Sequence, residues 1–271
     1  MPSLFHADDG RYFNMERLKA AAHETVSSSS LIQRCVAGDL DAARALSLGF
    51  WPFTRDFEVA IDNRANSAGL PREPLNVKFG QSTTRRTLIE SARTIKRLAD
   101  SEIVGVFEGA RENLQEMQKD EKRHSHHWRA DAKRLGLTEA ELDSQVTTPE
   151  VQALTDATRV ESLVAFFAVL ASTEFIAEEL GDTLAHARAY TDLFSNTRAI
   201  WMEVHTIPHD GEPSHEEIVL DFARAYQPPK ADGSEEDATD IEALVIKGIR
   251  MFGVAADAVE ARYAAMRIAA E

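Results

Sequence analysis

The sequence predicts an all-α protein, and three observations favour this fold class. Helix-forming residues dominate the chain from end to end, and short Gly, Pro or Ser breaks separate segments with helical periodicity. No run of alternating β-branched residues is long enough to form a sheet. Hydrophobic residues make up 44% of the 271 residues and charged residues 28%, as expected for a folded globular protein. We therefore expect one helical domain over residues 1–271.

Capping residues and breaks place the helices along the chain. Thr138 precedes two glutamates, and Thr148 precedes Pro149, so both threonines are suited to begin a helix. Gly136 fits a C-terminal stop after Leu135. Residues 69–74 and 227–236 are expected to be loops. The expected helices span residues 14–27, 30–37, 40–66, 83–122, 123–135, 138–144, 150–155, 158–180, 183–206, 213–226 and 238–267.

Charge and hydropathy exclude several classes of partner. The formal net charge is -15, and no cluster of Lys and Arg offsets it, so neither nucleic acid nor an anionic membrane is expected to bind. The longest apolar stretch, Leu163 to Ala171, is about half the length that a membrane-spanning helix needs. No signal peptide is evident, and the single cysteine, Cys35, excludes an intrachain disulfide framework. We expect a cytoplasmic protein in which Cys35 serves packing.

The first candidate site lies around Glu121 and His124. Residues three apart lie on one face of a helix, so this pair can point at a common centre, whereas His126 points away. Helix bundles present carboxylates and imidazoles to iron in this way. The alternative is a solvated polar face with incidental histidines.

The second candidate is Glu174, which follows the apolar run ending at Ala171. A helix that is apolar nearly all round is buried, and a carboxylate inside it costs several kcal/mol unless its charge is compensated. A metal ion would compensate it. Two alternatives remain open: Glu174 faces water at the end of the helix, or Glu178, one turn later, takes its place.

The third candidate is a segment with several histidines and acids, from Trp201 to Glu216. Pro208, Gly211 and Pro213 are expected to interrupt the helix, because proline clashes with the preceding turn. A break would let residues on its two sides converge. The alternative is a polar loop between helices. The candidate ligands are His205, His209, Asp210, Glu212 and His215.

The donor types favour iron over zinc. The chain has no cysteine cluster and many carboxylates, which argues against structural zinc. A mixed set of His and carboxylate ligands with open positions suits iron, with manganese as the alternative.

The order of these motifs resembles that of the heme-oxygenase-like diiron oxidases and oxygenases, which are relatives of thiaminase-type and pyrroloquinoline-quinone-synthase-type helical proteins. Residues 31–53 look like the opening helix pair of this family. Glu121-x-x-His124-x-x-x-Trp128, followed by Leu135-Gly136-Leu137-Thr138, is similar to the metal-binding helix of the branch that converts fatty acids to terminal alkenes. The resemblance covers most of the chain between residues 31 and 225.

The resemblance implies a heme-oxygenase-like multi-helix bundle, with a core at about residues 28–226 and a C-terminal helix at about 238–267. It also implies two Fe2+ ions with O2 as co-substrate. In the alkene-forming branch a carboxylate follows the Trp-Pro pair, whereas this chain has Arg55 there, so alkene formation is not inferred. The implied metal ligands are Glu121, His124, Glu174, His205, Asp210 or Glu212, and His215.

We expect an O2-dependent, non-heme iron oxidoreductase that acts on a small amino-acid-derived or fatty-acid-derived substrate by N-oxygenation, desaturation or oxidative C–C cleavage. Arg55 is a candidate to bind a substrate carboxylate, with a structural or surface ion pair as the alternative. Two other function classes remain open. One is a metal-free thiaminase-like or quinone-synthase-like enzyme, of which the thiaminase type needs a nucleophilic cysteine. The other is a non-enzymatic helical binding protein. A homodimer is left open.

Overall fold

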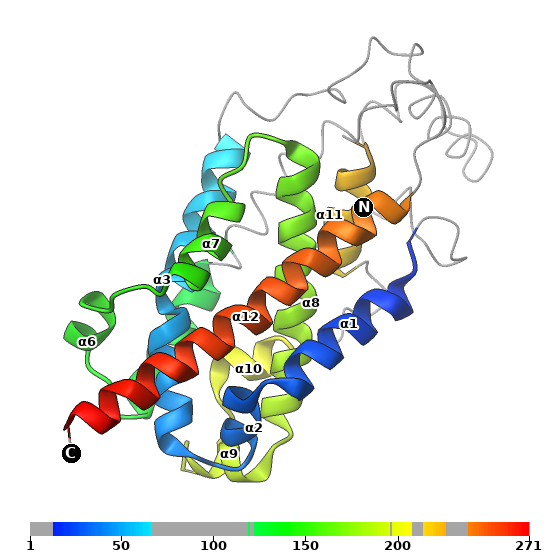
Figure 1. Cartoon of the computed structure of the whole chain (residues 1–271). Coiled ribbons are helices and arrows are strands. Elements are labelled where there is room, and N and C mark those ends of the chain that lie inside the picture. Colours follow the sequence, from blue (N-terminus) through cyan, green and yellow to red (C-terminus); the bar gives the residue numbers. More distant parts are fainter. Residues whose placement is uncertain are drawn as a thin grey trace, which may run out of the picture.

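The computed structural model describes residues 13–66, 119, 122–195, 197–207, 214–225 and 238–270. All regular secondary structure in these residues is helical, so the predicted all-α class is confirmed. The predicted helix over residues 83–122 falls almost entirely outside the described residues. The assignment of one domain stays a prediction. Figure 1 shows the long helices lying side by side, with α12 crossing in front of α8.

The helices agree with the predicted segments over most of the described chain. A further helix, over residues 122–134, matches the segment predicted at 123–135. The labelled helices are α1 (Met15–Ser28), α2 (Ser30–Val36), α3 (Leu40–Asn66), α6 (Glu139–Asp143), α7 (Pro149–Ala157), α8 (Leu163–Ala185), α9 (Arg188–Asp192), α10 (Ile200–Val204), α11 (His215–Ala225) and α12 (Ala238–Ala270).

The predicted capping residues act as expected. Thr138 Oγ1 accepts a hydrogen bond from the backbone N–H of Glu141, while the Glu141 carboxylate accepts one from the N–H of Thr138. Thr148 Oγ1 accepts from the N–H of Val151 at the start of α7. Gly136 has a φ of 85°, the left-handed conformation that ends the preceding helix. Local sequence signals therefore fix these boundaries.

One predicted helix has shifted bounds, and another is wrong. The segment predicted at 158–180 starts later, because Thr158 ends α7 and the Ser162 side chain begins α8 by accepting from the N–H of Ala165. The helix predicted at 183–206 does not exist: α8 continues through Gly181 to Ala185, and two five-residue helices, α9 and α10, follow. Ser195, with a φ of 59°, lies in the turn between them.

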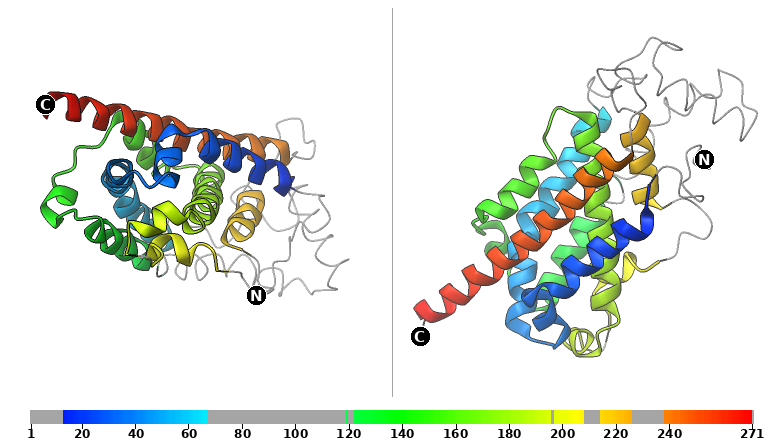
Figure 2. Two further views of the ribbon diagram at one scale, coloured as in Figure 1. Left: turned by 90° about the horizontal axis from the view of Figure 1, so that it is seen from below. Right: turned by 45° about the vertical axis from the view of Figure 1, so that its right-hand side comes forward.

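Helix α8 is the central element of the bundle. It contacts α1, α10, α11 and α12, and the two further views show these helices grouped around it (Figure 2). Fifteen of its residues are buried, from Leu163 to Ala185, which explains its apolar composition on every face. A polar side chain in the middle of α8 is therefore held inside the protein. No described helix combines the length and the apolar composition needed to cross a membrane.

Candidate functional site

Glu174 lies in the middle of α8 and is buried, with 6% of the residue exposed. Its Oε1 atom is fully buried and has no hydrogen-bond partner, while Oε2 lies 3.7 Å from Nδ1 of His215. The alternative in which Glu174 faces water is wrong. Glu178, the other alternative, is exposed and forms an ion pair with Lys19 at 3.4 Å. The buried carboxylate of α8 is therefore Glu174.

Three histidines act on this carboxylate. Burial alone would raise the pKa of Glu174, but the adjacent His215 imidazole, followed by smaller interactions with His205 and His124, holds this pKa below the usual glutamate value. His215 is the first residue of α11, and its side chain is 25% exposed. His124 lies on the helix over residues 122–134. Three separate helical segments thus place an imidazole within electrostatic range of α8.

His124 and His205 are in direct contact. Their ring centroids are 4.5 Å apart, with an angle of 51° between the planes. Burial, followed by the charge of His124, lowers the pKa of His205 to about 4. His205 is therefore neutral at pH 7, which is the protonation state that a metal ligand requires.

The orientation of His205 is fixed by its own helix. Its Nδ1 lies 2.7 Å from the backbone oxygen of Trp201, and its ring packs against the Trp201 indole, with 4.0 Å between the centroids and an angle of 39° between the planes. A carbonyl oxygen only accepts, so Nδ1 carries the proton and Nε2 keeps a free lone pair. Metal-binding histidines are commonly oriented by such a hydrogen bond.

Two residues outside the predicted ligand set position α10. Gly181 of α8 lets α10 approach closely, because a Cβ at this position would lie 2.8 Å from Cβ of His205 and 3.0 Å from the backbone oxygen of Met202. The buried Asp131 carboxylate accepts a hydrogen bond from the backbone N–H of Trp201 at 2.8 Å. Asp131 therefore holds the start of α10, which has no capping side chain of its own.

Sequence reasoning missed both of these positioning residues. For Asp131 a signal was present: it follows His124 by seven residues, which places both on one face of a helix. Gly181 looks in the sequence like a helix break. Only the packing of α10 against α8 explains why a glycine is needed there.

A second buried acid, Glu216, follows His215. Burial, and then the charge of Glu178, raises the pKa of Glu216 to about 7. Its Oε1 lies 4.0 Å from Nζ of Lys19, at the edge of ion-pair range. The start of α11 thus adds a carboxyl group that is only partly ionised at neutral pH.

Several residues that the sequence analysis considered are not found near Glu174 in the described structure. Arg55 is exposed and forms an ion pair with Asp56 at 2.9 Å. His126 is exposed, as predicted. Cys35 is fully buried, which agrees with its predicted packing role. Four candidate ligands, Glu121, His209, Asp210 and Glu212, lie outside the described residues. Within the described part of the chain, no three His, Cys, Asp or Glu side chains stand close enough to hold a metal ion.

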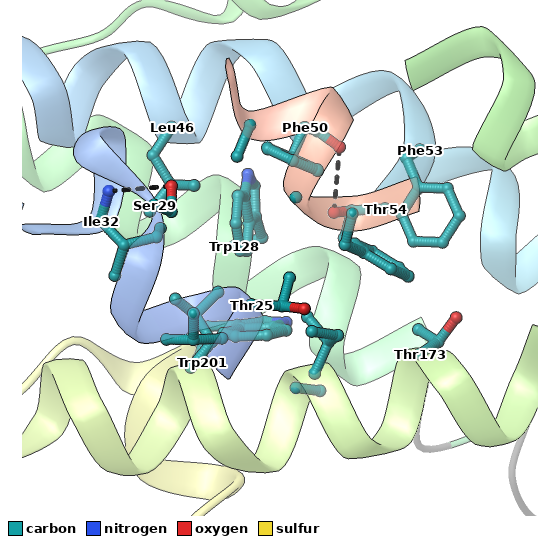
Figure 3. Close-up of a pocket in the computed structure, with 17 residues that line it drawn as sticks. Thr25, Ser29, Ile32, Leu46, Phe50, Phe53, Thr54, Trp128, Thr173 and Trp201 are labelled. Atoms are coloured by element: carbon teal, nitrogen blue, oxygen red, sulfur yellow. Dashed lines mark hydrogen bonds between the residues drawn. The ribbon is translucent and has the colours of Figure 1, made fainter. Parts of the chain in front are cut away.

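An apolar pocket lies beside His205, whose neighbour Trp201 is one of the lining residues (Figure 3). This pocket was not predicted from the sequence. Phe50, Phe53 and Phe252 line part of it, and the ring centroids of Phe53 and Phe252 are 5.3 Å apart. Trp128 and Trp201 line another part and meet edge to face at 4.9 Å. Arg55 is not among the lining residues. A pocket formed by side chains from seven helices has no local sequence signal.

Comparison with solved structures supports the fold. The chain is similar to a TenA homolog from Pseudomonas syringae pv. tomato, with a TM-score of 0.62 and 15% sequence identity. The match covers 96% of this chain and 97% of the other. No protein-family model matches the chain, and no curated protein matches its sequence. The described helices thus share the helical fold of this TenA homolog.

Proposed function

We propose that this protein is a non-heme iron-dependent oxidoreductase that activates O2 to oxidise a small organic substrate. The observation that carries the proposal is the unpaired Oε1 of Glu174, a carboxylate oxygen buried inside an apolar helix. A buried polar atom without a partner costs about 1–3 kcal/mol, and more when it carries charge. A cation bound at this oxygen would remove that cost.

The donor set around Glu174 fits iron. In the proposed site, Glu174 and the imidazoles of His124, His205 and His215 bind the metal after their side chains move closer together, because no three of the described side chains stand close enough to hold it as they lie. Glu121 and one acid among Asp210 and Glu212 are proposed as further ligands. Mixed histidine and carboxylate donors suit iron, and manganese is the alternative. We propose two ions, as the resemblance implies. Bound ferrous iron supplies the electrons that reduce O2.

The described residues prepare the site in three ways. The carbonyl of Trp201 holds the His205 ring with Nε2 free. The lowered pKa of His205 keeps this ring neutral at working pH. The apolar residues next to Glu174 exclude water, which strengthens electrostatic interactions inside the site. Each feature supports metal binding without a rearrangement of α8.

Anaerobic loading with Fe2+, followed by removal of free metal and a colorimetric iron assay, tests the proposal. We expect the wild-type protein to retain iron and the variants Glu174→Ala, His124→Ala and His205→Ala to lose most of it. Matched controls are Glu178→Ala, one turn further along α8, and His186→Ala, an exposed histidine at the end of α8. Wild-type protein that retains no iron, or equal retention in all variants, would refute the proposal.

A metal-free thiaminase-like or quinone-synthase-like enzyme is the second candidate, and the likeness to the TenA homolog favours it at the level of the fold. The thiaminase type requires an ionisable cysteine. Burial raises the pKa of Cys35, the single cysteine of the chain, to about 12, so its thiol is a poor nucleophile at pH 7. Activity that survives a strong iron chelator but is lost in Cys35→Ala would favour this candidate over the first.

A further inference from the structure

The apolar pocket and the candidate iron site share three helical segments. Trp128 follows His124 by four residues, and Ala177 follows Glu174 by three, so each pair lies on one helix face. On α10 the order is reversed: the pocket residue, Trp201, precedes His205 by four residues and stacks against it. The pocket therefore begins about one helical turn from the proposed ligands. Its full lining is Thr25, Val26, Ser29, Ile32, Leu46, Phe50, Phe53, Thr54, Trp128, Thr173, Ile176, Ala177, Leu180, Trp201, Phe252, Gly253 and Ala256.

The pocket walls offer no charge to a ligand. None of the lining residues is acidic or basic. Their hydroxyl groups are largely occupied by the backbone: Thr54 Oγ1 donates to the carbonyl of Phe50 at 3.1 Å, and Thr173 Oγ1 donates to the carbonyl of Val169 at 3.0 Å. A charged group in such a pocket would lose its hydration without compensation. Whatever occupies the pocket is therefore uncharged there.

Trp201, one of the lining residues, has a buried donor that is not used. The Nε1 atom of Trp201 is buried and has no acceptor among the described residues, and only 8% of this residue is exposed. The other tryptophan of the pocket differs, because Nε1 of Trp128 donates to the backbone oxygen of Ser47 at 2.9 Å. In Figure 3 the nitrogen of Trp201 lies at the end of the indole that points toward the middle of the lining residues. An unpaired N–H in an apolar pocket favours a ligand that brings an acceptor.

We propose, as an extension of the proposed function, that this pocket holds the non-reacting part of the substrate, and that this part is an uncharged hydrocarbon group with one hydrogen-bond acceptor, such as a carbonyl or ether oxygen. The acceptor binds the N–H of Trp201, which makes Trp201 a specificity-determining residue. The reacting end of the substrate lies toward His124, Glu174 and His205. Small zwitterions with a charged side chain are excluded as substrates.

The available space agrees with a group of this kind. About 70 Å³ of the pocket is open to the centre of a water-sized sphere. A single water needs roughly 10–15 Å³ by the same measure. The pocket therefore accommodates a chain or ring of several carbon atoms, and a hydrocarbon group fills it without leaving polar atoms unpaired.

Binding of three probes to the metal-free, full-length protein tests the proposal. Hexane, 2-hexanone and 3-hexanone have the same chain length, and the ketones add one acceptor at two positions. The measured quantity is the dissociation constant of hexane divided by that of the better ketone. We expect Trp201→Phe to lower this ratio about tenfold, because it removes the donor and keeps an aromatic ring.

Trp128→Phe is the matched control, since it makes the same change in the same pocket but removes a donor that already serves Ser47. We expect its ratio to stay within twofold of wild type. An equal fall in both variants, or no fall in Trp201→Phe, would overturn the role of Trp201. Wild-type protein that binds none of the three probes would overturn the role of the pocket.

A second measurement on wild-type protein covers the case in which Trp201→Phe does not fold. The indole N–H resonance of Trp201 in a ¹H–¹⁵N spectrum should move downfield with the better ketone and much less with hexane. Equal shifts with both probes would refute the proposal. All these measurements use metal-free protein, so their outcome is independent of the iron-retention assay, and failure of either proposal is seen separately.

Discussion

Asp131 provides a direct test of how the site is held in place. Its Oδ2 accepts from the backbone N–H of Trp201 at 2.8 Å, and its Oδ1 accepts from Nη1 of Arg134 at 2.9 Å. Only 6% of the residue is exposed. Asp131→Ala leaves the first N–H groups of α10 without an acceptor. The position of Trp201 on this short helix, and of His205 directly after its end, then depends on packing alone.

The expected loss of stability follows from these contacts. A hydrogen bond to a charged group contributes about 1.5–3 kcal/mol. Arg134 keeps its bonds to the carbonyl oxygens of Phe194 and Arg198, so its share of the loss is small. We therefore expect Asp131→Ala to lower the free energy of unfolding by about 3 kcal/mol. Asp131→Asn keeps one acceptor oxygen and should cost about 1 kcal/mol.

The pH dependence has a defined sign. Burial raises the pKa of Asp131, although hydrogen bonds from Trp201, Ile200 and Arg134 oppose the shift. The folded state thus holds this proton more tightly than the unfolded state. The part of the stability that arises from this pKa difference is full below the unfolded pKa and is lost as the pH rises through the folded pKa, while the hydrogen bonds of Asp131 remain. The advantage of wild type over Asp131→Asn should therefore be smaller at pH 7.5 than at pH 4.5.

Urea unfolding of metal-free protein, followed by far-UV circular dichroism, measures these differences. Asp143→Asn, a change at an exposed aspartate of α6, is the control and should lie within about 0.5 kcal/mol of wild type. An Asp131→Ala variant as stable as this control would refute the reasoning, as would an advantage over Asp131→Asn that grows with pH.

Three further predictions concern packing, the cysteine and the buried acid. Gly181→Ala should lower the free energy of unfolding by about 1–3 kcal/mol and weaken iron retention, because the new Cβ collides with His205. The control is Gly253→Ala, whose Cβ meets only the end of the Thr25 side chain at 3.1 Å and should lower stability less. A thermal melt compares the two variants. Cys35 should resist a thiol reagent at pH 8 until urea unfolds the protein, and rapid labelling of folded protein would contradict its packing role. The raised pKa of Cys35 contributes stability below about pH 9 that is lost as the pH approaches 12. Cys35→Ala should therefore flatten this alkaline decline in stability. Glu174→Leu should leave metal-free protein as stable as wild type or more stable by about 1–2 kcal/mol while abolishing iron retention, and a loss above about 2 kcal/mol would show that Glu174 is structural.

The sequence predicted the fold where local signals decide it. The caps at Thr138 and Thr148 and the stop at Gly136 lie where the structure has them, because each depends on a few neighbouring residues. The helix predicted at 183–206 failed because tertiary packing decides there: Gly181 continues α8, and Asp131 caps α10 from another helix. Such interactions have no periodic pattern in the sequence.

The candidate site was predictable in part for a similar reason. The burial of Glu174 follows from the apolar run around it, and this prediction is confirmed. The contact of His124 with His205 joins residues far apart in the chain, and the motifs anticipated a common centre without its geometry. The apolar pocket was not predicted, because residues of seven helices form it and each alone looks like core.

Glu174 is the residue that distinguishes the proposed metal site from an ordinary apolar core. A sequence selected only for stability would place a leucine in the middle of α8, since every neighbouring helix packs an apolar face there. Three imidazoles act on this carboxylate, and one of them, His205, is held neutral by burial. Acid and imidazoles gathered inside an apolar bundle are expected to lower the stability of the metal-free protein, and the proposed cation would reverse that effect by mass action. The fold of the TenA homolog accommodates this arrangement without requiring it, because function depends on the site that a fold carries.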